Sequence, residues 1–298
     1  METMSGIFPE LQAPFREGGS IDTDSMAKQA EHCIAAGAHG LVFPGMNGES
    51  GCLFEAERRT LVRVMTETAA GRVPVVAGVC GVSEAQAVAQ AQHAGEVGAD
   101  AILILPECCS QAGDPRVALG AVAEAAQMPL IMVHDWERTS LALAAELLHI
   151  IENIRYIQET VPEEDCRPED HSVSAMIAAG GDACRGVFGS RMGHYMIPEM
   201  RRGVCGFMPG AFCPEIYRAI WDSFHNDTEE KARTLFADLR PMLTLMEDAG
   251  LLVCKEALVR RGVFATTVMR QSGLRELDPY YGHEFERAHA RLEPYFAV

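Results

Sequence analysis

Short runs of apolar residues recur along the chain, separated by longer segments in which apolar residues follow helical spacing. The runs "VPVVAGV" (73–79), "AILILP" (101–106) and "PLIMVHD" (129–135) are nearly all apolar and do not alternate with polar residues. Such runs are typical of parallel strands that are covered on both faces. The pattern predicts eight strands, at residues 5–13, 39–45, 73–79, 101–106, 129–135, 154–160, 184–190 and 203–210.

The segments between these strands predict helices. "SEAQAVAQAQHAGEVGAD" (83–100), for example, is rich in alanine and ends in glycines that are typical of helix C-termini. Eight β/α units within residues 5–210 favour an α/β fold of the (β/α)8 TIM-barrel class. The main alternative is an open doubly wound sheet, but no G-x-G-x-x-G sequence follows the first strand.

Strand-like runs stop after residue 213. Three helical stretches follow, at 213–224, 228–250 and 251–264. We therefore expect a barrel over residues 1–213 and a C-terminal helical region over residues 214–298 that packs beside it as an appendage.

Composition narrows the possible partners. The chain has 298 residues and a net charge of −17, which disfavours binding to nucleic acid. No apolar run approaches the roughly 18–20 residues that cross a bilayer, and the N-terminus lacks the features of a signal peptide. We expect no membrane partner, a cytoplasmic location, and ten cysteines that remain reduced thiols.

A TIM barrel places its chemistry at the C-terminal ends of the strands. In this chain several of these ends carry polar residues. The candidates are Asn47, Gly48, Glu49, Glu107, His134, Asp135, Arg138, Gln158, Glu159, Ser190 and Arg191.

The glycine-rich loop "GMNGES" (45–50) is the first of these strand ends. Glycines allow close approach to the backbone, and N–H groups at a helix start favour an anion such as a carboxylate. The alternative is an ordinary glycine turn with Asn47 or Ser50 as a helix cap.

At these residues the sequence resembles the dihydrodipicolinate synthase / N-acetylneuraminate lyase family over nearly its whole length. The resemblance rests on "GMNGES", "VPVVAGV", "IMVHDWERT" (131–139), and "RRGVCGFMPG" (201–210) with "KEALVRRGVF" (255–264). It implies a homo-oligomeric barrel, a dimer or often a tetramer. It also implies 2-oxo acid chemistry through a lysine Schiff base at the end of strand six, with the substrate carboxylate held by the loop after strand two.

Two departures from the family pattern affect the mechanism. Gln158 stands at the position of the Schiff-base lysine, and Val133 replaces a tyrosine that relays protons. The three lysines of the chain, Lys28, Lys231 and Lys255, all fall in helix-like segments. A Schiff base needs a primary amine, which an amide cannot replace.

The resulting hypothesis is a lyase for a small 2-oxo or sugar acid that works without a lysine Schiff base. Gln158 is expected to hydrogen-bond the oxo or hydroxyl oxygen, while His134, Asp135, Glu107 or Glu159 move protons. The residues expected to bind the substrate are Asn47, Gly48, Glu49, Arg138, Ser190 and Arg191.

Two alternatives remain open. The first is a catalytically inactive barrel that serves as a carboxylate-binding or scaffold protein. The second is a metal-assisted lyase, in which His134 would be joined by other polar residues at the strand ends, but no close ligand spacing such as H-E-x-x-H supports it. We therefore expect neither a metal nor a cofactor. The acidic loop at 161–172 is either a lid or a solvated segment, and we favour the latter.

Overall fold

The computed structural model describes residues 3–108, 114–135, 139–160, 173–189, 191–271, 273 and 276–296. Eight strands form one sheet in the order β1-β8-β7-β6-β5-β4-β3-β2. The strands are β1 (Gly6–Ile7), β2 (Leu41–Phe43), β3 (Val75–Val79), β4 (Ala101–Ile104), β5 (Leu130–His134), β6 (Ile154–Glu159), β7 (Gly186–Gly189) and β8 (Gly206–Phe207). The α-helices are α1 (Thr23–Ala35), α2 (Glu55–Ala69), α3 (Glu84–Glu96), α4 (Pro115–Ala126), α5 (Leu141–Ile150), α6 (Val173–Gly180), α7 (Met196–Arg201), α8 (Pro214–Asn226), α9 (Glu229–Ala249), α10 (Leu251–Arg260) and α11 (Pro279–Leu292).

The eight predicted strands are confirmed, and so is the alternation of strands and helices. The first and last strands are much shorter than the apolar runs that predicted them. β1 and β8 each contain two residues, and Pro9 and Pro209 follow them closely. Proline has no N–H to donate to a ladder, so the regular ladder is interrupted there and continues only as isolated bridges of Glu10 with Val42 and Gly210.

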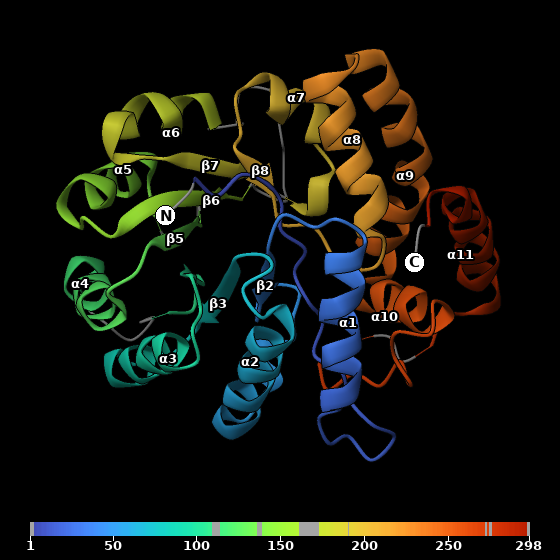
Figure 1. Cartoon of the computed structure of the whole chain (residues 1–298), viewed down its shortest axis with the longest axis horizontal. Coiled ribbons are helices and arrows are strands. Elements are labelled where there is room, and N and C mark those ends of the chain that lie inside the picture. Colours follow the sequence, from blue (N-terminus) through green and yellow to red (C-terminus); the bar gives the residue numbers. More distant parts are fainter. Residues whose placement is uncertain are drawn as a thin grey trace. The chain divides into compact units, whose positions relative to one another are not determined.

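The chain divides into two compact units, and the first comprises Met1–Ser5 and Pro74–Met208. Here β3 to β8 pair in parallel, each with the next strand along the chain. The strands are buried, and α3, α4, α5 and α6 lie outside them (Figure 1). Tyr156 in β6 is almost fully buried, and its hydroxyl accepts a hydrogen bond from the Met4 N–H at 3.0 Å.

The second unit comprises Gly6–Val73 and Pro209–Val298. It contains the three helices predicted after residue 213, which the structure places at α8, α9 and α10. It also contains α11, which the apolar pattern did not predict and which packs on α9. A buried ion pair between Glu215 of α8 and Arg261 ties α8 to the end of α10, with 2.5 Å between Glu215 Oε1 and Arg261 Nη2. The expected boundary between barrel and appendage at residue 213 remains a prediction.

His32 in α1 gives the second unit a pH-dependent stability. Its side chain is buried, and burial, assisted by the nearby Arg261 cation, lowers its pKa to about 4. Because the unfolded chain binds this proton near pH 6.5 and the folded chain does not, stability falls as the pH drops from 6.5 through 4. The loss expected from this one group is about 3 kcal/mol.

Chemical denaturation at a series of pH values measures this effect. The His32→Leu variant is expected to lose less stability than the parent chain between pH 6.5 and 4. His283→Leu provides the control, because His283 lies exposed on α11. Equal pH dependence in the parent and in His32→Leu would contradict the assignment.

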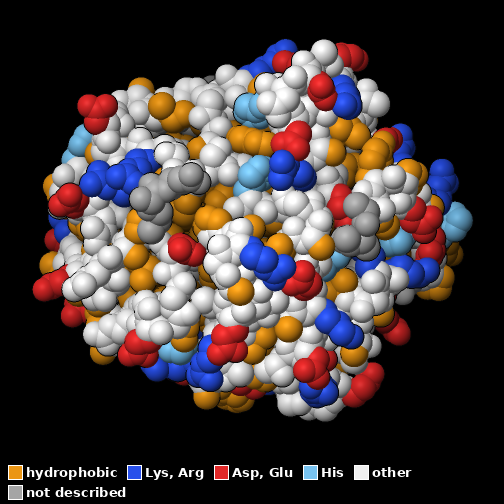
Figure 2. Space-filling view, viewed as in Figure 1, with side chains coloured by type: hydrophobic (Ala, Val, Ile, Leu, Met, Phe, Trp, Pro, Cys, Tyr) orange, Lys and Arg blue, Asp and Glu red, His pale blue; other side chains and the backbone are white. Residues whose placement is uncertain are grey.

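The surface bears charges of both signs. On the face shown in Figure 2, Lys and Arg side chains lie among Asp and Glu side chains and do not form a continuous basic region.

Among the helices in the described part of the chain, none combines the length and the apolar character needed to cross a bilayer. The eight cysteines in the same part of the chain are free thiols.

Candidate functional site

The C-terminal ends of β5 and β6 carry the central candidates of the sequence analysis. Val133 is the register partner of Gln158, and His134 is the register partner of Glu159. Successive side chains of a strand point to opposite faces. Gln158 and Val133 therefore share one face of the sheet, and His134 and Glu159 share the other.

His134 and Glu159 form a buried pair on their face. His134 Nδ1 lies 3.0 Å from Glu159 Oε1, and both side chains are fully buried. His134 Nε2 lies 2.9 Å from the carbonyl oxygen of Thr139, just before α5. A carbonyl can only accept, so Nε2 carries a hydrogen. Thr160 Oγ1 donates to the carbonyl of His134, which further links the two strand ends.

Gln158 has apolar neighbours on its own face. It is 5% exposed, and its register partners are Val133 on β5 and Phe188 on β7. Asp135 directly follows β5, two residues after Val133, and alternation continued past the strand end predicts that it lies on the same face as Val133. Asp135 is half-buried, and its carbonyl accepts a hydrogen bond from the Thr139 N–H at 2.7 Å. Asp135 is thus the ionisable candidate expected to share a face with Gln158.

The other strand-end candidates of the first unit are spread out. Glu107 is exposed in the turn after β4. Arg191 is half-buried after β7 with a left-handed backbone, and its carbonyl accepts from His194 N and lies 2.8 Å from His194 Nδ1. Arg138, Ser190 and the loop at 161–172 lie outside the described residues. Within the described ranges, no three His, Cys, Asp or Glu side chains are grouped as ligands for a metal ion.

The glycine-rich loop after β2 lies in the second unit, and its donors bind acceptors of the chain itself. The N–H and Nδ2 of Asn47 donate to Glu10 Oε2, at 3.0 and 2.8 Å. The N–H of Gly48 donates to the carbonyl of Gly45 at 3.2 Å. Binding of a substrate carboxylate by Asn47 and Gly48 stays a prediction, and the structure adds Glu10 as a competitor for the donors of Asn47.

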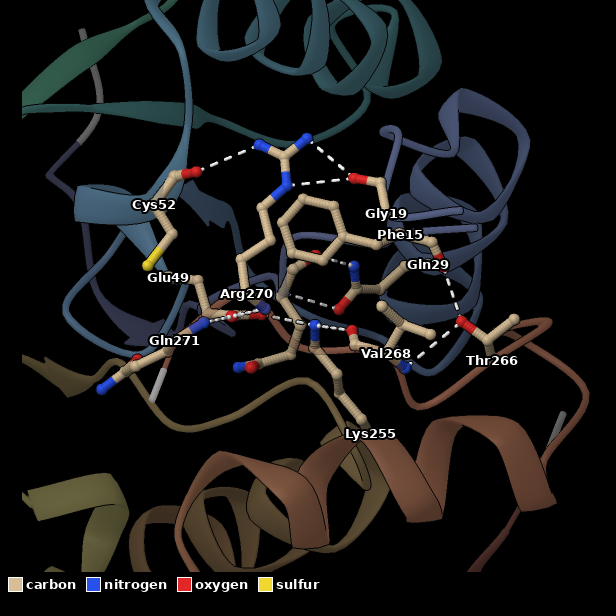
Figure 3. A network of polar contacts seen from close by, with 11 residues as sticks. Phe15, Gly19, Gln29, Glu49, Cys52, Lys255, Thr266, Val268, Arg270 and Gln271 are labelled. Carbon is tan, nitrogen blue, oxygen red and sulfur yellow. Dashed lines mark hydrogen bonds and ion pairs between the residues drawn. The ribbon is translucent and has the colours of Figure 1, made fainter. Parts of the chain in front are cut away.

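Glu49, the next loop residue, binds protein donors with both carboxylate oxygens (Figure 3). Oε2 lies 2.5 Å from Nζ of Lys255, and both side chains are fully buried. Oε1 accepts the N–H groups of Arg270 and Gln271, each at 2.8 Å. Burial lowers the pKa of Lys255, and the Glu49 carboxylate opposes that shift. Glu49 holds this geometry with φ at 52°, in the left-handed region.

Arg270 extends the same cluster. Its guanidinium forms a bidentate pair with Glu57, with contacts of 2.5 and 2.6 Å, and donates to the carbonyls of Gly19 and Cys52. The hydrogen bonds from Arg270 lower the pKa of Glu57. The ring of Phe15 has the Lys255 ammonium 4.7 Å from its centroid and the Arg270 guanidinium 4.5 Å from it. Together, these contacts hold segment 266–271 against the loops after β1 and β2.

The structure confirms that the three lysines lie in helices. Lys28 is exposed on α1, Lys231 is on α9 with its Nζ 2.7 Å from Asp227, and Lys255 is buried on α10. The roles of Glu10, Lys255 and Arg270 were missed from sequence. A signal existed for one of them, since Glu10 is an isolated charge within the apolar run at 6–15.

Comparison with known proteins agrees with this architecture. Two dihydrodipicolinate synthase structures superpose on nearly the whole chain. The one from Agrobacterium tumefaciens has a TM-score of 0.83 at 20% identity and covers 97% of this chain and 98% of its own. The one from Bacillus anthracis has a TM-score of 0.83 at 22% identity, with coverages of 97% and 99%. At these identities the likeness shows the fold, which is the expected TIM barrel.

Curated relatives match at higher identity over shorter regions. A 4-hydroxy-tetrahydrodipicolinate synthase from Phenylobacterium zucineum is 37% identical over 145 residues, 48% of this chain and 49% of that protein. The chain thus spans about half the length of the first curated relatives that it matches. An L-2-keto-3-deoxyarabonate dehydratase from Azospirillum brasilense is 24% identical, over 97% of this chain and 94% of that protein.

The sequence profile described as the Dihydrodipicolinate synthetase family matches residues 3–274. Together with the barrel fold, this match shows that the chain belongs to the dihydrodipicolinate synthetase family.

Proposed function

We propose that the chain is a lyase for a small 2-oxo or hydroxy acid that works without a Schiff base to lysine. The family and the dehydratase relative from Azospirillum brasilense support a lyase of this substrate class. The observation that carries the mechanistic part is Gln158, a buried amide at the end of β6 in a chain whose three lysines all lie in helices.

The mechanism replaces the iminium by hydrogen bonding. An N–H of the Gln158 amide donates to the oxo oxygen of the substrate and stabilises the negative charge that develops there. Asp135 takes a proton from the carbon next to the oxo group and returns it later, which leaves an enolate between the two steps. Both residues lie on one face of the sheet by alternation, and the surrounding apolar side chains strengthen the hydrogen bond by excluding water.

His134 and Glu159 have a positioning role in this proposal. Their contact and the Thr160 hydrogen bond fix the ends of β5 and β6. The rigid strand ends then hold Gln158 and Asp135 at a constant separation. Arg191, which follows β7, is the described candidate for binding a distal carboxylate or hydroxyl.

Proton-to-deuterium exchange tests the proposal. Pyruvate and a panel of other 2-oxo acids are followed by NMR in D2O, with and without EDTA. We expect exchange at the carbon beside the oxo group that exceeds the buffer rate and is unaffected by EDTA. Loss of the exchange with EDTA would instead favour the metal-assisted alternative.

A trapping experiment tests the missing Schiff base separately. Incubation with pyruvate and borohydride is expected to leave the mass of the chain unchanged. A pyruvyl adduct on any lysine would contradict the assignment of Gln158.

A second candidate function is a binding or scaffold protein without turnover. The observation that favours it is the apolar character of Val133 and Phe188, the register partners of Gln158, because neither side chain can transfer a proton. Absence of exchange across the whole panel would support this candidate over the lyase. A homo-oligomeric state and a cytoplasmic location remain predictions under either function.

A further inference from the structure

The glycine-rich loop at 45–50 holds a carboxylate, and that carboxylate belongs to the chain. Glu10 Oε2 accepts two hydrogen bonds from one residue, 3.0 Å from the Asn47 N–H and 2.8 Å from the Asn47 Nδ2. One donor is a backbone N–H and the other a side-chain amide N–H, and the carboxylate oxygen accepts both in charge-assisted hydrogen bonds. The loop is therefore a carboxylate site by its geometry as well as by its sequence.

The fit between Glu10 and the loop is close. A Cβ added at Gly45 would lie 2.5 Å from Glu10 Cδ, and one added at Gly48 would lie 3.1 Å from the carbonyl oxygen of Leu11. Real Cβ atoms do not come as near as the first of these distances. Glycine at position 45 thus leaves the space that the Glu10 carboxylate fills.

The backbone of Glu10 is held in place beside the loop. Its N–H donates to the carbonyl of Pro209 at 2.7 Å, and the residue forms parallel bridges with Val42 and Gly210. The N–H of Leu11 donates to the carbonyl of Val42 at 2.9 Å. Glu10 itself is fully buried. These contacts keep its side chain next to the loop in the folded chain.

We propose that Glu10 is a built-in ligand of this loop and determines what the loop can bind. While Glu10 is present, a carboxylate from solution finds the Asn47 donors occupied and the adjacent space filled. When its side chain is removed, the loop becomes a site for a small monocarboxylate such as formate, acetate, propionate or pyruvate. This inference concerns residues 10 and 45–50 alone and does not depend on the lyase proposal.

Chemical rescue of Glu10→Ala tests the inference. The variant is expected to unfold several degrees below the parent chain, because Asn47 loses its acceptor and a cavity remains. Sodium acetate or propionate is expected to raise the unfolding temperature of the variant in a saturable manner, as for any ligand of the folded state. Sodium chloride at equal ionic strength is the control, and the parent chain should respond equally to both salts.

Two results would overturn the proposal. One is a Glu10→Ala variant that unfolds at the same temperature in acetate, propionate and chloride. The other is a rise of equal size in the variant and in the parent chain, which would be a general salt effect.

A double-mutant cycle with Gly45→Ala adds a test that needs no ligand. Gly45→Ala is expected to destabilise the parent chain, because its Cβ meets Glu10 Cδ, and to have little effect in the Glu10→Ala background. Additive effects would contradict the close fit.

If Glu10→Ala does not fold, Glu10→Gln is measured in its place. The amide keeps the shape and loses the carboxylate, so unfolding at the parental temperature would refute a carboxylate site.

Discussion

Replacing Lys255 with methionine is expected to lower the free energy of unfolding by about 3–5 kcal/mol. Methionine is apolar and similar in length to lysine, so packing on α10 changes little while the positive charge disappears. Glu49 then keeps a fully buried carboxylate whose remaining described donors are the Arg270 and Gln271 N–H groups. A buried charge without its partner destabilises the folded state, because the charge has lost its hydration and no ion pair replaces it.

Urea unfolding of three variants measures this effect. Lys231→Met is the matched control, because Lys231, in the first turn of α9, forms an exposed pair with Asp227, which precedes the helix. Exposed ion pairs contribute about 0.2–1 kcal/mol. The double variant Lys255→Met with Glu49→Gln is expected to be more stable than Lys255→Met alone, since it no longer buries an unpaired charge. Equal losses in Lys255→Met and Lys231→Met would show that the buried pair has no special role.

Replacing Gln158 with leucine is expected to slow substrate deuterium exchange by about 10²–10³-fold. Removal of one preorganised donor to a developing oxyanion has an effect of this size. Leucine fills a similar volume and matches the apolar neighbours Val133 and Phe188, so the fold should be preserved. Exchange rates of the variant and the parent chain are compared by NMR on the substrate with the fastest parental exchange.

Gln86→Leu is the control for this substitution, because Gln86 lies exposed on α3. Thermal unfolding of both variants establishes that they are folded under the assay conditions. Parental exchange rates in Gln158→Leu would remove Gln158 from the mechanism and direct attention to other donors at the strand ends.

The sequence predicts the barrel well because its strands are set by local composition. The runs at 75–79, 101–104 and 130–134 are buried strands that can be recognised without knowing their partners. The limits of β1 and β8 depend on Pro9 and Pro209, which a reading of apolar runs ignores. Helix α11 was missed although Asp278 and Pro279 mark its start, because six of its fourteen residues are charged or histidine and they interrupt its apolar positions.

The candidate site was less predictable, for a physical reason. Gln158 can be found from sequence because a strand end is a local feature. The partners of Glu49 cannot, because Lys255 lies 206 positions away and Arg270 lies 221 positions away. Likewise, alternation predicts that His134 and Asp135 point to opposite faces, but only the register of β5 with β6 pairs His134 with Glu159.

The left-handed backbone of Glu49 has a consequence for which residues position 49 can accept. Glycine adopts this conformation without strain, whereas a residue with a Cβ does so at a cost of about 1 kcal/mol or more. Glycine would nevertheless be a poor choice, because it would leave the Lys255 ammonium buried with only the carbonyl of Val268 and the Phe15 ring as described partners. A choice of residue from the backbone angle alone would place glycine at position 49 and would leave Lys255 without its carboxylate partner. Glutamate is favoured at position 49 because its carboxylate neutralises the Lys255 ammonium, although the left-handed backbone there favours glycine.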